Sequence, residues 1–355
     1  MSRPKQAIVE DDIQAIVARD LPWAQLSGCQ VVVTGAAGFL GSYLVRSLLA
    51  LHPMGKVEQP VRVVALVRNL DRARQRFADL PEAGQLEFRR WDLNTIALPD
   101  LGDTQYVLHA ASQASPRFYG TDPVGTLLPN TVGTAALLEA LRRAPRPRGL
   151  LFVSSGEVYG AVSSDKALRE ESYGIVDPAS VRACYAESKR AGETLCVAWH
   201  AQHKLPTFIA RPFHTYGPGL SAQDGRVFCD FAYNVARNEN IAMQSDGSAR
   251  RAFCYVSDAV AGLLTVLLKG MPARPYNVAN PTGELSVAEL AELLVSLYPE
   301  KKLSVDRIFL RDSTKYMPSA YSRLVPDVSR LQQLGWQALI DPAVGFKRMV
   351  ESIHI

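Results

Sequence analysis

The sequence is poor in cysteine and histidine and has no long apolar run. Its five cysteines are odd in number and lack CxxC spacing, so we expect reduced thiols rather than a disulfide framework or a zinc site. The six histidines show no metal-ligand spacing, and no metal is predicted. No segment reaches the about 18 apolar residues that a membrane helix needs. Residues 1–30 also lack the apolar core of a signal peptide, so we expect a cytoplasmic protein with no membrane partner.

Neither sign of charge is in large excess. The chain has 39 Lys and Arg residues against 35 Asp and Glu, a net charge of +4. The one dense basic cluster is Arg142, Arg143, Arg146 and Arg148. We interpret it as a solvated helix end and loop, and with no nucleic-acid motif beside it we expect no nucleic-acid partner. A hydrophobic content of 47% over 355 residues excludes a disordered chain and allows one large α/β unit or two lobes.

The most informative segment present is residues 31–49. Three valines and a threonine read as a strand, three glycines follow at a spacing of three, and leucines then recur at helical spacing. Gly35 permits the tight turn, Gly38 lets the backbone approach a pyrophosphate, and Gly41 lets the helix pack closely on the strand. Because a helix N-terminus presents free N–H groups and a positive dipole end, this segment predicts a dinucleotide-binding βα unit.

The remaining pattern predicts the architecture. Strand-like segments at 31–34, 61–67, 86–89, 106–109, 150–154 and 207–210 alternate with helical ones such as 131–143 and 185–203. This alternation predicts an α/β fold, a Rossmann-like doubly wound parallel sheet. After Pro218 the pattern loosens to a short strand near 242–245, a helix over 256–268 and a capping box at Ser286 and Glu289. We expect an N-terminal extension at 1–27, a dinucleotide-binding domain at 28–212, and at 213–355 a smaller mixed substrate lobe with some chain returning to the first domain.

Tyr185 and Lys189 are the main candidates for chemistry. They stand four residues apart on a predicted helix and therefore share one face. A free tyrosine is a poor base, with a pKa near 10, but a neighbouring ammonium favours the phenolate. Ser155 and Glu157 follow a predicted strand, and ligands bind at the carboxyl ends of strands in such sheets. Ser155 is thus placed to bond a substrate hydroxyl, and Glu157 to meet the same substrate.

Together these residues resemble the extended short-chain dehydrogenase/reductase family, in particular NAD-dependent epimerase/dehydratase members that modify nucleotide sugars. The resemblance covers about residues 29–350 and rests on segments 34–41, 109–111, 154–160, 185–189, 211–218, 326–327 and 334–336, and on Asn130, Gly133 and Thr134. Three further stretches resemble UDP-glucuronate decarboxylases: 114–123, 224–227 and 251–258.

The resemblance implies a set of site residues. The catalytic residues would be Tyr185, Lys189, Ser155 and Glu157. The substrate contacts would be Ser115, Tyr119, Glu157, His214, Arg226 and Arg251. The cofactor contacts would be Gly35, Ala37, Gly38, Phe39, Leu40, Gly41, Arg68, Asp92, Leu93, Ala110, Ala111, Ser112, Asn130, Ser154, Tyr185, Lys189, Arg211 and Pro212.

The choice of cofactor is open in the residues. An acid at the end of the second strand would grip the ribose 2′-hydroxyl of NAD, but here the sequence reads Val67-Arg68-Asn69, and an arginine can accommodate the 2′-phosphate of NADP. Because the implied reaction returns its hydride and retains its cofactor, and related sugar enzymes mostly use NAD, we expect NAD and leave NADP possible.

Position 157 bears on the reaction. The resemblance implies that 4-epimerases carry a small residue there, whereas decarboxylases and 4,6-dehydratases carry glutamate. Dehydratases add an aspartate just before it, and this chain has Gly156. The implied reaction is therefore decarboxylation: C4 oxidation with Tyr185 as base, loss of CO₂ from the 4-keto uronate, and hydride return. Two departures, His214 for asparagine and Gly219 for arginine, leave the sugar open.

Other functions remain as alternatives. The nearest are a nucleotide-sugar 4-epimerase and a 4-keto-reductase or dehydratase. A non-catalytic NAD(P) sensor would have lost the Tyr185 and Lys189 pair, and an NADPH-dependent carbonyl reductase would not need the uronate-like stretches. The resemblance also implies a homodimer through helices 131–143 and 185–203. Their apolar positions exceed what one sheet-facing stripe needs: Leu137, Leu138, Leu141, Leu195 and Trp199.

Overall fold

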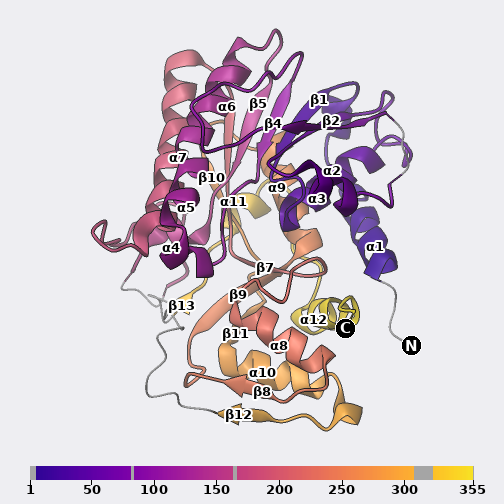
Figure 1. The fold of residues 1–355 in the computed structure, drawn as a ribbon, viewed down its shortest axis with the longest axis vertical. Helices are drawn as coiled ribbons and strands as arrows, with labels where there is room; N and C mark the ends of the chain where they lie inside the picture. Colours follow the sequence, from indigo (N-terminus) through magenta and orange to yellow (C-terminus); the bar gives the residue numbers. More distant parts are fainter. Residues whose placement is uncertain (1–4, 81–83, 163–165, 308–322, 355) are drawn as a thin grey trace.

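A seven-stranded sheet, parallel throughout, forms the larger part of the molecule (Figure 1). The structure is a computed structural model that describes residues 5–80, 84–162, 166–307 and 323–354. The strand order is β10-β6-β5-β4-β1-β2-β3. The strands are β1 Gln30–Thr34, β2 Arg62–Val67, β3 Leu86–Arg90, β4 Tyr106–His109, β5 Gly149–Val153, β6 Thr207–Pro212 and β10 Pro275–Val278. The predicted Rossmann-like α/β class is confirmed, and six of these strands lie within a few residues of their predicted positions.

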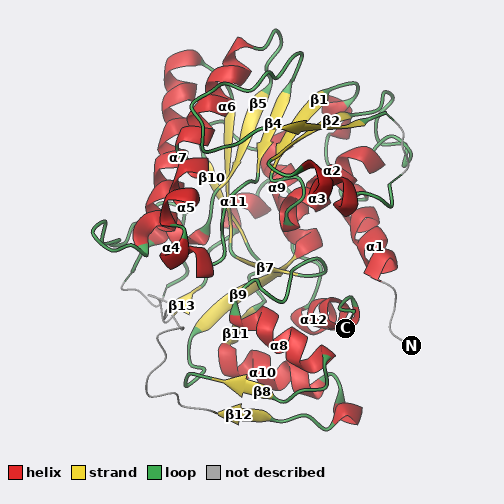
Figure 2. Cartoon of the chain, viewed as in Figure 1, coloured by secondary structure: helices red, strands yellow, loops and turns green. Residues whose placement is uncertain are grey.

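Alternate residues of the five inner strands enter separate cores on the two faces of the sheet. In β1, Val31 and Val33 join one hydrophobic cluster and Val32 joins the other. The first face is covered by α1 Lys5–Val17, α2 Phe39–Ala50, α3 Leu70–Arg76 and α9 Val256–Lys269. The second is covered by α6 Val132–Arg143 and α7 Ala183–His203, with α4 Arg117–Thr121 and α5 Pro123–Asn130 beside them (Figure 2). Burial of apolar residues on both faces is what holds a parallel sheet.

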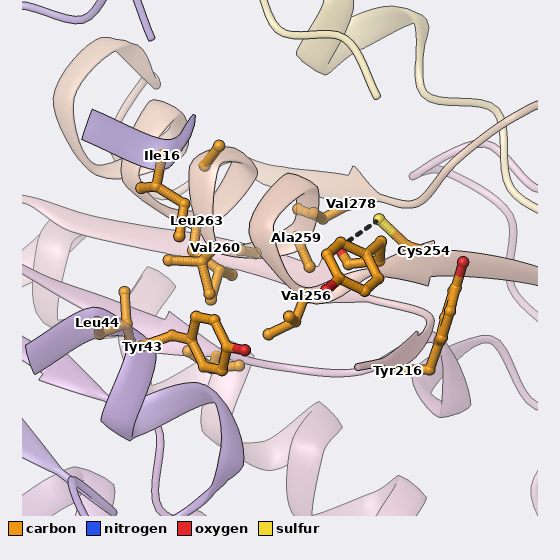
Figure 3. Packing of buried hydrophobic residues seen from close by; sticks show 14 of the residues in the cluster. Ile16, Tyr43, Leu44, Tyr216, Cys254, Val256, Ala259, Val260, Leu263 and Val278 are labelled. Atoms are coloured by element: carbon orange, nitrogen blue, oxygen red, sulfur yellow. Dashed lines mark hydrogen bonds between the residues drawn. The ribbon is translucent and has the colours of Figure 1, made fainter. Parts of the chain in front are cut away.

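Chain from the second half of the sequence completes the first domain. Helix α9 packs on β5 and β6, and β10 adds the edge strand beside β6. Figure 3 shows where the parts meet: Ile16 of α1, Leu44 of α2, Val260 of α9 and Val278 of β10 lie in one cluster. The N-terminal helix is therefore part of the main core rather than an appendage.

The smaller lobe is a mixed layer of short strands and helices. Strand β9 Arg250–Tyr255 lies at its centre and pairs with β7 His214–Tyr216, β11 Glu284–Ser286 and β13 Arg323–Leu324. A second pair joins β8 Ile241–Met243 to β12 Val305–Arg307. Helices α8 Val227–Ala236, α10 Val287–Ser296 and α12 Pro342–Glu351 pack around them, with α11 Ser329–Gln332 against β10. Short 3₁₀ turns lie at Trp23–Leu26, Gly156–Tyr159 and Pro299–Lys301. The predicted capping box of Ser286 and Glu289 opens α10.

Two sequence interpretations concern surface groups. The basic cluster is a helix end and loop, as interpreted: Arg142 and Arg143 pair with Glu139, and Arg146 pairs with Asp103. The dimer argument needs correction, because the three leucines of α6 (Leu137, Leu138 and Leu141) are fully buried against the sheet of their own chain. Within the described ranges, no helix is long and apolar enough to cross a bilayer, and no group of three or more His, Cys, Asp or Glu side chains could hold a metal ion.

Candidate active site

The glycine turn between β1 and α2 is as tight as its sequence suggests. Gly35 has a φ of +64°, and a Cβ placed there would lie 2.7 Å from the Cα of Ala111. A Cβ on Gly41 would collide with the carbonyl oxygen of Gly35. Gly38 forms the N-cap of α2 and supplies no side chain to cap it. The first-turn N–H groups of α2, at Phe39, Leu40 and Gly41, are therefore available to a phosphate.

The turn lies where the strand order reverses, between β1 and β4. Ala110, Ala111 and Ser112 follow β4, and the Ala111 N–H donates to the hydroxyl of Thr34 at 3.3 Å. Asn130 donates from its amide nitrogen to Ser112 and Ser188, at 3.1 and 3.0 Å, while its buried Oδ1 has no hydrogen-bond partner. The tight glycine turn, the uncapped helix and this free buried acceptor fit a dinucleotide in the crevice at the switch point.

The other cofactor candidates surround this crevice. Leu93 packs where a side chain at Gly133 would otherwise stand, and Asp92 accepts a hydrogen bond from the Asn94 N–H in the turn after β3. Ala37 lies partly buried within the glycine turn, and Arg68 lines a cavity at the carboxyl end of β2.

Tyr185 and Ser155 meet at the carboxyl end of β5. Ser155 caps the 3₁₀ turn that follows β5, and its hydroxyl is hydrogen-bonded to the phenol of Tyr185 near the start of α7. Burial raises the pKa of Tyr185 to about 12, although the Ser155 hydrogen bond opposes that rise. The phenol is therefore protonated at neutral pH and needs a nearby positive charge before it can act as a base.

Lys189 shares the face of α7 with Tyr185, as predicted, but its ammonium is directed elsewhere. Nζ donates to the carbonyl oxygen of Val153 at 2.6 Å and lies 5.8 Å from the centre of the Tyr185 ring. Burial lowers the pKa of Lys189 to about 7. This hydrogen bond holds the ammonium at the end of β5, and the expected effect of Lys189 on the pKa of Tyr185 stays a prediction.

A buried ion pair occupies the strand ends beside Lys189. Arg211 forms a two-point ion pair with Glu193, at 2.9 and 2.6 Å, and also donates to the Tyr159 hydroxyl. Ser154 donates to the same carboxylate at 2.5 Å. The side chains of Ser154 and Arg211 are thus engaged within the chain. Among the predicted cofactor contacts at this edge, the backbone atoms of Ser154 and Arg211 and the residue Pro212 are still available to a ligand.

The first group of substrate candidates lies around Tyr185. The Tyr119 ring stacks on the Tyr185 ring at 5.2 Å, with an interplanar angle of 15°. Glu157 faces Arg182, whose Nη2 lies 3.8 Å from Oε2 and whose guanidinium lies 5.8 Å from the Tyr119 ring centre. Sequence reasoning missed Arg182. Its spacing from Tyr185, three residues earlier at the N-cap position of α7, is the signal that could have found it.

The second group comes from the smaller lobe. Arg226 forms a two-point ion pair with Asp224, and the Ser115 hydroxyl donates to the Asp224 carbonyl oxygen. Burial, with Arg251 and Arg226 nearby, holds the pKa of His214 well below its usual range, so its ring is neutral. The buried Nδ1 of His214 has no hydrogen-bond partner. The guanidinium of Arg251 beside this neutral imidazole favours an anionic ligand, whereas the charge of Arg226 is balanced by Asp224.

Gly156 is held small by its surroundings. A Cβ added there would lie 2.7 Å from Cε1 of Phe213, because the Phe213 ring fills the space that a side chain would take. An aspartate at position 156 would therefore require Phe213 to move.

The family described as "NAD dependent epimerase/dehydratase family" matches residues 31–279. The chain belongs to this family. Among curated members it is 32% identical over 332 residues to UDP-glucuronic acid decarboxylase 6 of Arabidopsis thaliana, covering 93% of this chain and 90% of that one. It is 30% identical over 326 residues to UDP-glucuronic acid decarboxylase 1 of Danio rerio, covering 91% and 72%.

Solved members of the epimerase/dehydratase family share the fold. The UDP-glucuronic acid 4-epimerase of Bacillus cereus, in complex with UDP-glucuronic acid and NAD, has a TM-score of 0.76 at 24% identity, covering 91% of this chain and 98% of that one. DesIV, a dTDP-glucose 4,6-dehydratase of Streptomyces venezuelae with NAD bound, has a TM-score of 0.76 at 25% identity, covering 91% and 96%. The predicted membership of this family is confirmed.

Proposed function

We propose that this chain is a UDP-glucuronate decarboxylase-like enzyme that oxidises C4 of a nucleotide-linked uronic acid with retained NAD. One observation carries the proposal: the guanidinium of Arg182 and the carboxylate of Glu157 lie together beside the Tyr185–Ser155 pair. An alcohol-oxidising pair therefore adjoins a cation that can bind a sugar carboxylate. Decarboxylases among the relatives and NAD in the solved members support the same reaction and cofactor.

Each residue of the site has its own role in the reaction. Ser155 orients the C4 hydroxyl, and Tyr185 accepts its proton. When bound, the nicotinamide would supply the acceptor for the C4 hydride and the donor that restores it. The resulting 4-ketone is β to the C5 carboxylate, so the C5–C6 bond breaks with release of CO₂ and leaves an enolate. Arg182 and Arg251 bind the sugar carboxylate, and Tyr119 covers the sugar ring. Glu157 assists protonation of the enolate at C5. Positioned acid–base groups of this kind contribute roughly 10²–10⁴-fold each.

Dehydration is the less suitable reaction for this site. Expulsion of a C6 hydroxyl needs an acid close to it, and Phe213 fills the space beside Gly156 where that acid would stand. A uronate 4-epimerase is the second candidate, because the Bacillus cereus epimerase shares the fold and binds a uronate. The two reactions differ only after the 4-ketone forms. In epimerisation the carboxylate stays on the sugar, and in decarboxylation it leaves as CO₂.

The test is to incubate the purified enzyme with UDP-glucuronate, UDP-glucose and dTDP-glucose and to identify the products. We expect CO₂ and a UDP-pentose from the uronate and no 4,6-dehydrated product from the glucose derivatives. Formation of UDP-galacturonate without CO₂ would replace decarboxylation by epimerisation. If none of the sugars is converted, the non-catalytic NAD(P) sensor becomes the favoured function.

A variant checks the observation on which the proposal rests. Because hydrogen bonds to charged groups are worth about 1.5–3 kcal/mol, Arg182→Gln should weaken binding of UDP-glucuronate by about 10-fold or more. The affinity for UDP-glucose, which has no carboxylate, serves as the matched control and should change little. Equal losses for both sugars would place Arg182 outside carboxylate binding.

We also propose that the protein works in a reducing compartment such as the cytoplasm and as a homodimer. All five cysteines are free and buried, which suits reducing surroundings.

A further inference from the structure

A cavity lies at the carboxyl end of β2. It has a volume of about 300 Å³ and is bounded by the end of β2, the first turns of α3 and the end of β3. Its lining residues are Arg68, Asn69, Leu70, Asp71, Arg74 and Arg90. In a doubly wound sheet, the end of the second strand is where the adenosine ribose of a dinucleotide lies when its pyrophosphate binds the glycine turn after the first strand. The cavity therefore lies where the ribose hydroxyls of a bound dinucleotide are expected.

The charge in the cavity is positive. Three of its lining residues are arginines and one is an acid, Asp71. The Asp71 side chain is 95% exposed and makes only a 3.4 Å contact with Arg74. Asn69 is also engaged, since its Oδ1 accepts a hydrogen bond from the Arg72 N–H at the start of α3. Among the described residues that line the cavity, no carboxylate is thus held at the strand end to accept a ribose hydroxyl, although Asp122 interacts electrostatically with Arg68 from outside the lining.

Two of the guanidinium groups remain open to a ligand. Arg68 directly follows β2, and Arg90 stands opposite Val67 in the register of β2 with β3, so the two rise from neighbouring strand ends. Within the part of the chain that the structure describes, neither side chain has a hydrogen-bond partner in the protein. Arginine binds phosphate with paired, charge-assisted hydrogen bonds, whereas a ribose hydroxyl offers a single neutral group.

We infer that this cavity binds a phosphate on the ribose 2′-oxygen, so that the chain accepts NADP as well as NAD, with Arg68 and Arg90 as the recognising residues. The inference rests on the proposed dinucleotide cofactor and adds a specificity to its adenosine end. A carboxylate at this position would exclude the 2′-phosphate, and the cavity of this chain presents arginines instead.

Two small probes isolate the adenosine end from the reaction. Adenosine 2′,5′-bisphosphate carries the 2′-phosphate, 5′-AMP lacks it, and neither contains nicotinamide. Calorimetry should find the bisphosphate bound about 10-fold tighter or more, as expected for one charge-assisted contact. This preference should shrink as salt is raised, because the two arginines are exposed to solvent. NADP, which carries the same 2′-phosphate, should likewise bind more tightly than NAD.

Variants connect the preference to these residues. Arg68→Ala and Arg90→Ala should each reduce the preference for the bisphosphate by several-fold and leave 5′-AMP binding nearly unchanged. Arg62→Ala is the matched control, because Arg62 is an exposed arginine at the opposite end of β2. Equal or weaker binding of the bisphosphate by the wild type would overturn the inference, as would a full preference in Arg68→Ala.

The outcomes also separate this inference from the proposed function. If NAD binds and CO₂ is released while the 2′-phosphate is disfavoured, only the inference fails. If neither probe nor either dinucleotide binds, the dinucleotide site and the inference fail together.

Discussion

Tyr185 lies in surroundings that oppose its ionisation, and this sets what its variants should do. Its phenol is buried with a pKa of about 12 and is hydrogen-bonded to Ser155. Tyr185→Phe removes the proton acceptor for the first oxidation. We expect a fall in turnover of about 10²–10⁴-fold and no 4-keto sugar at any stage, measured by product chromatography.

Glu157→Gln should fail in a different way. Glu157 lies on the Arg182 side of the site, so oxidation at C4 stays partly possible while the carboxylate and enolate steps are impaired. We expect leaked 4-keto sugar together with a transient absorbance of the reduced nicotinamide. Glu292→Gln, at an exposed position of α10 in the smaller lobe, is the control and should behave like the wild type. If Glu157→Gln also behaves like the wild type with every sugar that the enzyme converts, position 157 has a structural role. The epimerase function is then favoured over decarboxylation.

At the residue scale, motif spacing predicts positions better than it predicts the direction of side chains. The shared face of Tyr185 and Lys189 follows from helical spacing. The hydrogen bond of Lys189 to Val153 does not, because it depends on how α7 sits over β5. The ion pair of Arg211 with Glu193 likewise joins residues that no short motif connects. Gly219 has a φ of +104° and leaves room for the Arg76 guanidinium of α3, a contact that sequence alone could not reveal.

At the scale of elements, α1 is held by one buried carboxyl group. Asp12 accepts hydrogen bonds from Tyr43 of α2 at 3.2 Å, Tyr255 of β9 at 2.9 Å and Arg348 of α12 at 3.1 Å. Burial raises the pKa of Asp12 from 3.8 to about 6. Between about pH 4 and pH 6 the folded protein therefore binds a proton that the unfolded chain does not.

Because of this proton, the free energy of unfolding depends on pH. The contribution of Asp12 to the free energy of unfolding falls as pH rises from 4 to 6 and then levels off, by about 3 kcal/mol at most. Asp12→Asn should remove this dependence. Urea unfolding at several pH values should show the wild type losing stability relative to the variant across that window. The exposed Glu10→Gln, on the same helix, is the control. Parallel pH curves for Asp12→Asn and the wild type would contradict the assignment.

Elements were predictable where their apolar pattern was strong. The central strands carry continuous valine and leucine runs because both of their faces are buried. Strand β10 is only four residues long, begins with Pro275 and buries the polar Asn277, so it lacks that pattern. It adds to the edge of the sheet, where a first-position proline costs no ladder hydrogen bond. Strand β9 is similarly obscured, since it begins with two arginines whose partners come from β11 and β13.

At the scale of the whole molecule, the face formed by α5 and α7 is the surface that suits a second copy of the chain. The two helices pack on each other at the outer side of the sheet (Figure 1). Val124 and Leu127 of α5 are 65% and 37% exposed, and Val197 of α7 is 44% exposed. Leu195 and Trp199 are partly buried against the core beneath. The exposed valines and leucine of this face, rather than the buried leucines of α6, are the apolar side chains that remain for an interface.

We therefore predict a homodimer that pairs the α5–α7 face of one copy with the same face of the other. Pairing like faces about a twofold axis gives a closed assembly. Light scattering at micromolar concentration should give twice the chain mass of 38.9 kDa. Val197→Glu should shift the protein toward the monomer, because a charge would be buried without a partner at the interface. Ile96→Glu is the control, since Ile96 is 85% exposed in the loop after β3 and belongs to neither α5 nor α7. A monomeric wild type would refute the dimer, and a dimer that survives Val197→Glu would place its interface on another surface.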